Sequence, residues 1–459
     1  MRCRSSSRIA SVDFLRGAVM VVMALDHTRG MVGNATFDAM DLTRTYPALF
    51  LTRWITHFCA PVFVFLAGTS AFLSTARGKS RSELSRFLWT RGLWLIVLEL
   101  TLVRFGWSFR LASPVLVGQV IWALGWSMIV LAVLIYLPVS VVALVGIAMI
   151  ASHNLLDGVQ AKSFGAFAWL WGILHGGYHF QVAPGVEFIP IYPLVPWIGV
   201  MAAGYGFGYL LLLDQRARRQ KLFWLGLGLT GAFMVIRAAN VYGDPQPWSM
   251  QKDFVFTCFS FVNCTKYPPS LLFLLMTLGP AILLLSVFDW AGVGQGVSLA
   301  ASVSETVNLQ ATAPIAIPPP HEVRSRRGNE SLISSDKNET RYLVSYKLEG
   351  DSRALNPEPE TQNSKLAWLT RPFIVFGRVP MFYYLLHLPL IHLLAVVVAY
   401  PQYKAALGSF YFTHPPSGYG HDLWVVYVVW IAAVLLLYPL CRWFAGVKQR
   451  RREAWLSYL

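Results

Sequence analysis

Three ionisable residues occur in a segment that otherwise has the character of a membrane helix. In MALDHTRGM, residues 23–31, Asp26, His27 and Arg29 follow a run of apolar and small residues. Charged groups at membrane depth are costly, so they rarely persist without a function. A carboxylate, an imidazole and a guanidinium can move protons, bind an anion or orient a substrate. The alternative is structural, because Asp26 and Arg29 are three residues apart and can pair with each other.

Histidines recur in two further apolar segments. His57 lies in TRWITHFCAPVFVF, and His387 lies in FYYLLHLPLIH. We predict a catalytic set of Asp26, His27, His57 and His387, in which His27 or His57 is the general base and Asp26 orients an imidazole. Adjacent residues on a helix point about 100° apart, so Asp26 would act on a histidine of another helix, such as His57. For each histidine alone, a structural hydrogen bond between helices is an equally good interpretation.

Basic residues supply candidate binding groups. Arg53 and Lys266 are predicted to contact an acceptor substrate. Three arginines near the opposite surface, Arg16, Arg91 and Arg378, would hold the phosphates of an anionic cofactor. The alternative for these three is that their charged ends reach to the membrane surface without binding a ligand.

The composition requires a membrane protein. The chain has 459 residues, of which 55% are hydrophobic and only 13% charged, and its mean hydropathy is +0.50. Soluble domains carry about 25% charged residues. We therefore predict an all-α, polytopic transmembrane helical bundle. The net charge of +15 lies in short loops beside apolar runs, which indicates membrane orientation and not binding of nucleic acid.

Apolar runs bounded by charge, Pro or Gly predict ten spans. Residues 163–180, which are shorter and interrupted by glycine, are expected to be re-entrant or interfacial. The Lys/Arg-rich loops fall on one side if the ten spans alternate, so both termini are predicted to be cytoplasmic in a multi-pass protein of the cytoplasmic membrane. The predicted spans are 12–33, 47–75, 87–109, 114–135, 138–153, 188–213, 221–241, 269–289, 372–400 and 422–445.

Composition also predicts a division of the chain. Residues 1–289 would form a bundle of eight spans, and 369–459 would add the last two spans and a basic tail. The segment 290–368 is rich in Ser, Glu, Pro and Asn and is predicted to be a disordered cytoplasmic insert. Cys258 and Cys264 share one loop, and a disulfide between them would require that loop to face an oxidising compartment; the sequence leaves open whether they pair. Small residues in GVMAAGYGFG, 199–208, favour close packing of helices.

Four segments together resemble a known family. SVDFLRGAVMVVMALDHTRGM (11–31), THFCAPVFVFLAGTSAFL (56–73), KYPPSLLFLLMTLGPAILL (266–284) and GRVPMFYYLLHLPLIH (377–392) are similar to the bacterial membrane family with the heparan-α-glucosaminide N-acetyltransferase catalytic domain, and more distantly to other membrane acyltransferases. The resemblance covers about 1–289 and 370–459. It departs from the lysosomal enzyme in the loop between the first two helices. The catalytic histidine of that enzyme lies in this loop, whereas this chain has NATFDAMDLTRTYP there.

The resemblance implies transfer of an acetyl group from cytoplasmic acetyl-CoA, the donor substrate, to an amino sugar or glycan outside the membrane. No metal is expected. The partners implied are membrane lipids and the extracytoplasmic acceptor, with a homo-oligomer left open and no nucleic acid. The competing hypothesis is a proton-coupled transporter or flippase of a lipid-linked saccharide, with the same polar residues acting as a proton relay.

Overall fold

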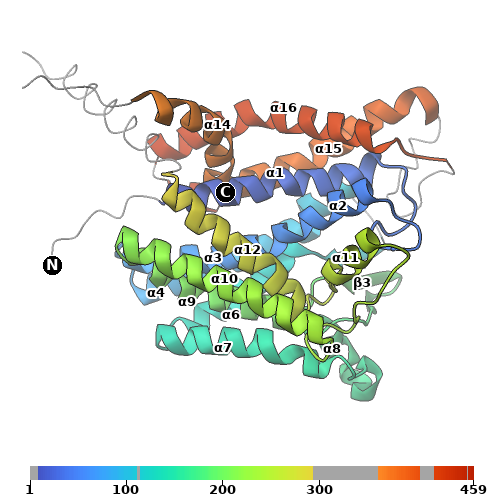
Figure 1. Ribbon diagram of the computed structural model, residues 1–459, viewed down its shortest axis with the longest axis horizontal. Helices are drawn as coiled ribbons and strands as arrows, with labels where there is room; N and C mark the ends of the chain where they lie inside the picture. Colours follow the sequence, from blue (N-terminus) through green and yellow to red (C-terminus); the bar gives the residue numbers. More distant parts are fainter. Residues whose placement is uncertain (1–8, 111–113, 293–359, 404–417, 452, 459) are drawn as a thin grey trace, which may run out of the picture.

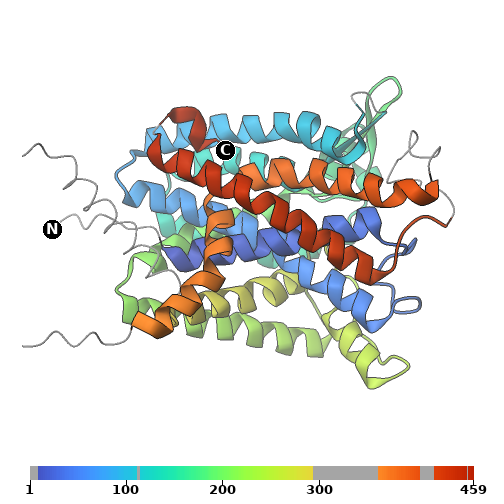
Figure 2. The ribbon, with the colours of Figure 1, turned by 90° about the horizontal axis from the view of Figure 1, so that it is seen from above.

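Long helices dominate the protein and run along a common direction. The computed structural model describes residues 9–110, 114–292, 360–403, 418–451 and 453–458. Most helices lie along the long axis of the molecule, as two perpendicular views show (Figures 1 and 2). One large apolar core joins residues from α1 near the amino terminus to α16 near the carboxyl terminus. The prediction of a helical bundle is therefore confirmed.

The helical elements follow in chain order. The α-helices are α1 (Ala10–Val32), α2 (Pro47–Ile55), α3 (Cys59–Ala76), α4 (Arg81–Leu98), α5 (Arg104–Ser108), α6 (Val120–Leu134), α7 (Val139–Ser152), α8 (Ala168–Leu174), α9 (Leu194–Phe207), α10 (Gln215–Ala239), α11 (Phe254–Val262), α12 (Leu271–Trp290), α14 (Glu360–Arg378), α15 (Pro380–Tyr403) and α16 (Leu423–Arg450). Short helical turns are η1 (Thr56–Phe58), the π-helical η2 (Glu99–Val103), η3 (His153–Leu156), η4 (Ala161–Phe167), η5 (Gly208–Leu212) and η7 (Ala454–Ser457).

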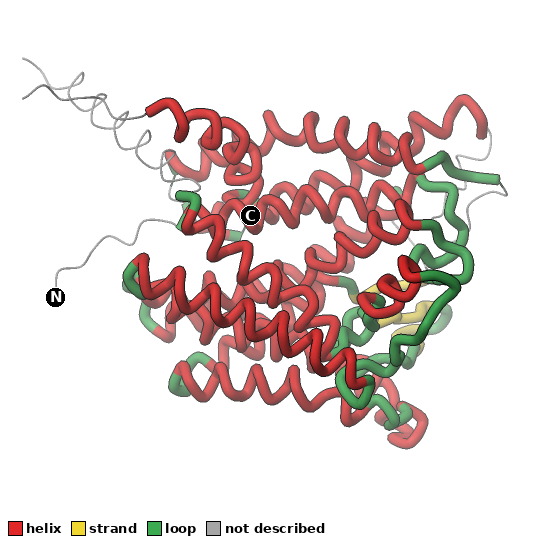
Figure 3. Tube along the Cα trace, viewed as in Figure 1, coloured by secondary structure: helices red, strands yellow, loops and turns green. Residues whose placement is uncertain are grey.

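A small sheet interrupts the helical pattern. Its three strands, β1 (Val115–Gly118), β2 (Phe180–Ala183) and β3 (Val186–Pro190), are arranged in the order β1-β3-β2. β1 pairs with β3 in parallel, with Val115 opposite Glu187. β2 pairs with β3 in antiparallel fashion, with an irregular register between Gln181 and Ala183. The strands lie among the loops at one end of the bundle (Figure 3).

Seven helical segments of the described chain are long and apolar enough to cross a membrane. The predicted number of ten spans is not confirmed, because the other predicted segments are shorter or carry too many charges. The protein is nevertheless a multi-pass membrane protein by the length and composition of its helices. The seven segments are Pro47–Ala76, Val139–Leu156, Leu194–Leu212, Gln215–Ala239, Leu271–Trp290, Pro380–Gln402 and Leu423–Arg450.

Three predicted spans differ from the observed elements. The segments 114–135 and 188–213 each begin with a strand, β1 and β3, before the helix starts. The segment 372–400 is divided between α14 and α15, and Pro380 begins the second helix. A proline is well placed in a first helical turn, where its missing N–H has no partner to lose. Residues 163–180 form parts of η4, α8 and a connecting loop and not one interfacial helix.

Glycines allow α1 and α14 to cross at short range. A Cβ atom on Gly17 would lie 1.7 Å from the Phe373 carbonyl oxygen, and one on Gly377 would lie 1.8 Å from the Asp13 carbonyl oxygen. The same holds for α3 and α9, where a Cβ on Gly204 would lie 2.1 Å from the Phe65 carbonyl oxygen. The predicted close packing of the segment 199–208 is therefore confirmed.

The two ends of the bundle differ in chemistry. We call one the basic end; it holds the loops 77–80 and 213–214 and the end of α16, with Lys/Arg residues around them. We call the other the sheet end; it holds β1–β3, α11 and the loop 263–270. The start of α1 and the end of α12 lie at the basic end (Figure 1). Helices that alternate in direction thus gather the basic loops on one side.

Two sequence predictions concern the regions between these helices. The predicted insert, 290–368, lies largely outside the described residues, which stop at 292 and resume at 360. The pairing of Cys258 and Cys264, which the sequence leaves open, is not formed: both are free, Cys258 being exposed and Cys264 buried in the loop that follows α11.

Candidate active site

Two histidines from different helices form a hydrogen-bonded pair toward the sheet end. His27 near the end of α1 and His387 in α15 approach with Nδ1 of His27 2.7 Å from Nε2 of His387. Their rings are stacked, with centroids 4.9 Å apart. Trp107 of α5 contacts the His27 ring edge-on, with centroids 5.0 Å apart. The two predicted catalytic histidines are therefore brought together.

The backbone of α15 fixes the direction of this hydrogen bond. Nδ1 of His387 lies 2.6 Å from the Tyr384 carbonyl oxygen, which can only accept, so Nδ1 carries a proton. In the neutral ring, Nε2 of His387 is then an acceptor, and Nδ1 of His27 must donate to it. The remaining nitrogen of His27, Nε2, keeps a lone pair. A proton taken up at this Nε2 can be balanced by a shift of the Nδ1 proton toward His387.

Asp26 is engaged by arginines and not by an imidazole. One carboxylate oxygen lies 3.1 Å from Nη2 of Arg29, and the other lies 2.5 Å from Nη1 of Arg53 in α2. The alternative prediction, an ion pair between Asp26 and Arg29, is confirmed. The prediction that Asp26 orients a histidine is wrong, because two guanidinium groups on either side occupy both oxygens. Asp26 instead ties the start of α2 to the end of α1.

His57 is buried beside this ion cluster without joining it. It lies in η1, where Pro61 lacks the N–H that would bond to the His57 carbonyl, so the chain turns more tightly between α2 and α3. The side chain is 2% exposed, and its Nδ1 has no hydrogen-bond partner within the described residues. Its ring packs on Phe273, with centroids 5.3 Å apart. His57 is therefore not paired with Asp26 or His27.

The loop 263–270 brings two further groups to the cluster. The charge of Lys266 acts on Asp26, His27 and His57, so the predicted acceptor-binding lysine belongs to the same electrostatic cluster as the histidines. Its Nζ lies 5.2 Å from the centre of the Tyr267 ring. Burial alone would raise the pKa of the Tyr267 hydroxyl, but the positive charges of Lys266 and Arg53 lower it below its ordinary value.

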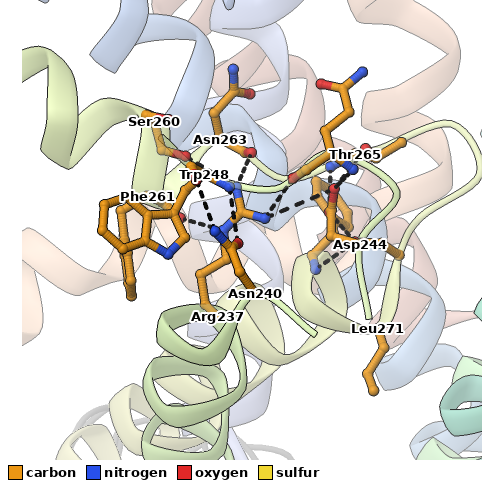
Figure 4. A network of polar contacts seen from close by, with 12 residues as sticks. Arg237, Asn240, Asp244, Trp248, Ser260, Phe261, Asn263, Thr265 and Leu271 are labelled. Carbon is orange, nitrogen blue, oxygen red and sulfur yellow. Dashed lines mark hydrogen bonds and ion pairs between the residues drawn. The ribbon is translucent and has the colours of Figure 1, made fainter. Parts of the chain in front are cut away.

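A buried polar network holds this loop in place (Figure 4). Asp244 accepts hydrogen bonds from the Thr265 backbone N–H at 2.8 Å and from the Ser270 hydroxyl at 2.6 Å, on either side of Lys266. Arg237 at the end of α10 is 1% exposed. Its guanidinium donates to the backbone carbonyls of Gln246, Ser260, Phe261 and Asn263 at 2.8–3.0 Å.

The three arginines predicted to hold a cofactor lie near one another toward the basic end. Arg16 donates to Asp13 at 3.1 Å, to the Gly377 carbonyl at 3.2 Å and to the Ser70 hydroxyl at 2.9 Å. The charge of Arg16 acts on Arg91, and Arg378 directly follows Gly377 in α14. Arg16 therefore connects α1, α3 and α14 whether or not it also binds a ligand.

Comparison with known families decides the assignment. The sequence profile described as "Heparan-alpha-glucosaminide N-acetyltransferase, catalytic" matches residues 8–242. The chain belongs to this family. A comparison with curated proteins gives no match. Membership in the heparan-α-glucosaminide N-acetyltransferase family indicates membrane acetyltransferase activity. The acetyl donor used by enzymes of this type is acetyl-CoA.

The matched region supplies only part of the cluster. His27, Arg53 and His57 lie within residues 8–242, whereas Lys266 and His387 lie beyond them. Within the described residues, no group of His, Cys, Asp or Glu side chains could hold a metal ion.

The sequence did not predict two residues of the candidate site, Trp107 and Tyr267. Trp107 contacts His27 from α5, and Tyr267 interacts by hydrogen bonding with Arg53 and with Tyr192, which follows β3. Tyr267 could have been found from its position beside Lys266 in TKYPPS. Trp107 gave no such signal, because tryptophans are common throughout the chain, which has 17.

Proposed function

We propose that this chain transfers an acetyl group from acetyl-CoA to an amine or hydroxyl of a sugar acceptor, with Nε2 of His27 as general base. The hydrogen-bonded pair of His27 and His387 is the observation that carries the proposal. The pairing leaves a lone pair on Nε2 and provides a second imidazole to share the charge that forms when Nε2 takes a proton.

The proposed reaction is a direct transfer. The acceptor nitrogen or oxygen attacks the thioester carbon, its proton passes to Nε2 of His27, and the new C–N or C–O bond forms as the C–S bond breaks. The proton then passes from His27 to the CoA sulfur, which leaves as the thiol. The imidazolium formed in between would be stabilised by sharing of the charge with His387.

Donor and acceptor would enter from opposite ends. We place the phosphates of acetyl-CoA against Arg16, Arg91 and Arg378 at the basic end, and the acceptor beside Lys266 and Arg53 at the sheet end. The excess of Lys and Arg in the loops of the basic end favours a cytoplasmic location for that end in the cytoplasmic membrane. CoA cannot cross the membrane, so the acetyl group would meet the acceptor inside the bundle.

Release of free CoA tests the proposal. Purified protein in detergent would be given acetyl-CoA and glucosamine, and free thiol and acetylated product would be measured for wild type, His27→Ala and His179→Ala. His179 is an exposed histidine at the sheet end, 3.6 Å from Glu187, and serves as the matched control. We expect turnover in wild type and His179→Ala and its loss in His27→Ala.

The same paired histidines would also suit a proton relay, so the transporter hypothesis is tested in parallel. In proteoliposomes, a transporter would move a lipid-linked saccharide in response to a proton gradient and without acetyl-CoA. An acetyltransferase would consume acetyl-CoA whether or not a gradient is present. Absence of acetyl-CoA consumption under all conditions would contradict the proposed function.

A further inference from the structure

The cluster around His27 carries more positive than negative charge. Asp26 is its carboxylate, and the cations that act on it are Arg29, Arg53 and Lys266. The same four groups act on His57 and on His27. Three positive charges and one negative charge leave an excess of two positive charges when the histidines are neutral.

Neighbouring groups do not neutralise this excess. Asp26 already pairs with both arginines, whose side chains are 17% and 14% exposed for Arg29 and Arg53. Within the described residues, no carboxylate lies within ion-pairing distance of Lys266, and its ammonium contacts the Tyr267 ring. A largely buried, uncompensated charge is unfavourable, so the cluster is more stable with an anion bound.

The position of Lys266 is built into the fold. The residues on either side of it are fixed by Asp244, through Thr265 at 2.8 Å and Ser270 at 2.6 Å. Asn263 is held by Arg237 through its carbonyl at 2.9 Å. Figure 4 shows that these bonds converge from the end of α10 and from the loop itself. The loop that carries Lys266 is therefore held in place by the fold before any ligand binds.

We propose that the acceptor sugar bears a phosphate group in addition to the amine or hydroxyl that receives the acetyl group, and that Lys266 and Arg53 bind this phosphate. The inference rests on the proposed function for the identity of the ligand as an acceptor. A phosphate monoester carries about −1.5 to −2 charge at neutral pH, which matches the excess of two positive charges. A neutral sugar would leave that excess uncompensated, and a single carboxylate would leave half of it.

Binding of two matched sugars tests the proposal without catalysis. N-acetylglucosamine 6-phosphate and N-acetylglucosamine differ only in the phosphate, and their affinities for the purified full-length protein would be measured by calorimetry. We expect the phosphorylated sugar to bind at least about tenfold more tightly, as for a charge-assisted contact. Lys266→Met should remove this preference, and Lys266→Arg should restore most of it.

Lys252→Met is the control for a change of charge at the same end. Lys252 precedes α11, and its Nζ lies 3.6 Å from the centre of the Phe256 ring, so its removal should leave the preference intact. Equal affinity for the two sugars, no detectable binding of the phosphorylated sugar, or an unchanged preference in Lys266→Met would each overturn the inference. Equal kcat/KM for glucosamine and glucosamine 6-phosphate as acceptors would also overturn it, while leaving the proposed function in place.

A second experiment distinguishes a phosphate carried by a membrane lipid from a phosphate on a water-soluble acceptor. The protein would be placed in nanodiscs of phosphatidylcholine with or without phosphatidic acid. Displacement of the sugar phosphate by phosphatidic acid, lost in Lys266→Met, would support a lipid-borne phosphate. Undiminished sugar phosphate binding would support a water-soluble acceptor.

Discussion

At the scale of single residues, the account depends on which nitrogen carries which proton. The Tyr384 carbonyl fixes the tautomer of His387, and His387 in turn fixes that of His27. Neither effect requires a carboxylate, which distinguishes this pair from a base oriented by Asp or Glu. Asp26 has a different task, because it binds two arginines and joins α1 to α2.

Substitution of His387 tests whether its hydrogen bond to His27 is needed for catalysis. His387→Gln can still accept the Nδ1 hydrogen bond of His27 through its amide oxygen, whereas His387→Leu cannot. We expect kcat for acetyl transfer to fall about 10²-fold or more in His387→Leu, with substantial recovery in His387→Gln. Steady-state kinetics measures both values. Equal rates for wild type and His387→Leu would remove His387 from the mechanism.

Titration of Tyr267 tests the positive potential beside the histidines. Lys266 and Arg53 stabilise the phenolate and lower the pKa of Tyr267, so its tyrosinate absorbance should develop at lower pH than that of ordinary tyrosines. The contribution of Tyr267 is obtained as the difference between wild type and Tyr267→Phe. In Lys266→Met this contribution should move to higher pH. An unchanged titration would show that Lys266 does not act on Tyr267.

At the scale of elements, the hydrophobic pattern predicted where apolar helices occur, but it did not predict that a strand precedes two of them. The strands β1 and β3 were absorbed into predicted spans because short apolar runs have no periodicity that separates strand from helix. Small residues at 199–208 did predict close packing. The pair of His27 and His387 could not be predicted from one sequence, because it depends on which helices are neighbours and on their rotation. For this reason the prediction named all three histidines as catalytic candidates, suggested His57 as a partner of Asp26, and gave no partner for His27.

The crossing of α1 and α14 gives a stability prediction. Gly17→Ala would force its Cβ against the Phe373 carbonyl oxygen, and we expect a loss of about 1–3 kcal/mol, as for overpacked cores. Gly30→Ala is the control in the same helix, because a Cβ there meets no atom within 4 Å. This change should be neutral or stabilise by up to about 1 kcal/mol. Thermal denaturation in detergent compares them, and equal midpoints would contradict the close crossing.

At the scale of the whole molecule, the bundle separates a basic end from a sheet end that holds the candidate acceptor groups. Most helices run along the long axis in both perpendicular views (Figures 1 and 2), and because consecutive long helices alternate in direction, the basic loops fall at the same end. The charge pattern of the sequence predicted this grouping. The small sheet and the Arg237–Asp244 network, which shape the opposite end, left no comparable pattern.

Labelling of a native cysteine tests which end faces outward. Cys258 in α11 is exposed at the sheet end, whereas Cys59, Cys264 and Cys441 are buried. In intact cells, a membrane-impermeant thiol reagent should label Cys258 in a Cys3→Ser background. Lys79→Cys, in a Cys3→Ser, Cys258→Ser background, should react only after permeabilisation, because it lies at the basic end. The opposite pattern would reverse the orientation of the protein.

The pH dependence of acetyl transfer tests the central claim, that His27 is the base, most directly. A general base acts only when unprotonated, so kcat/KM should rise with pH as the His27–His387 pair loses its proton and then reach a plateau. In His27→Ala the residual rate should be lower and should lack this rise, while His179→Ala should keep the wild-type profile. A His27→Ala protein that retains the wild-type rate and profile would contradict the account.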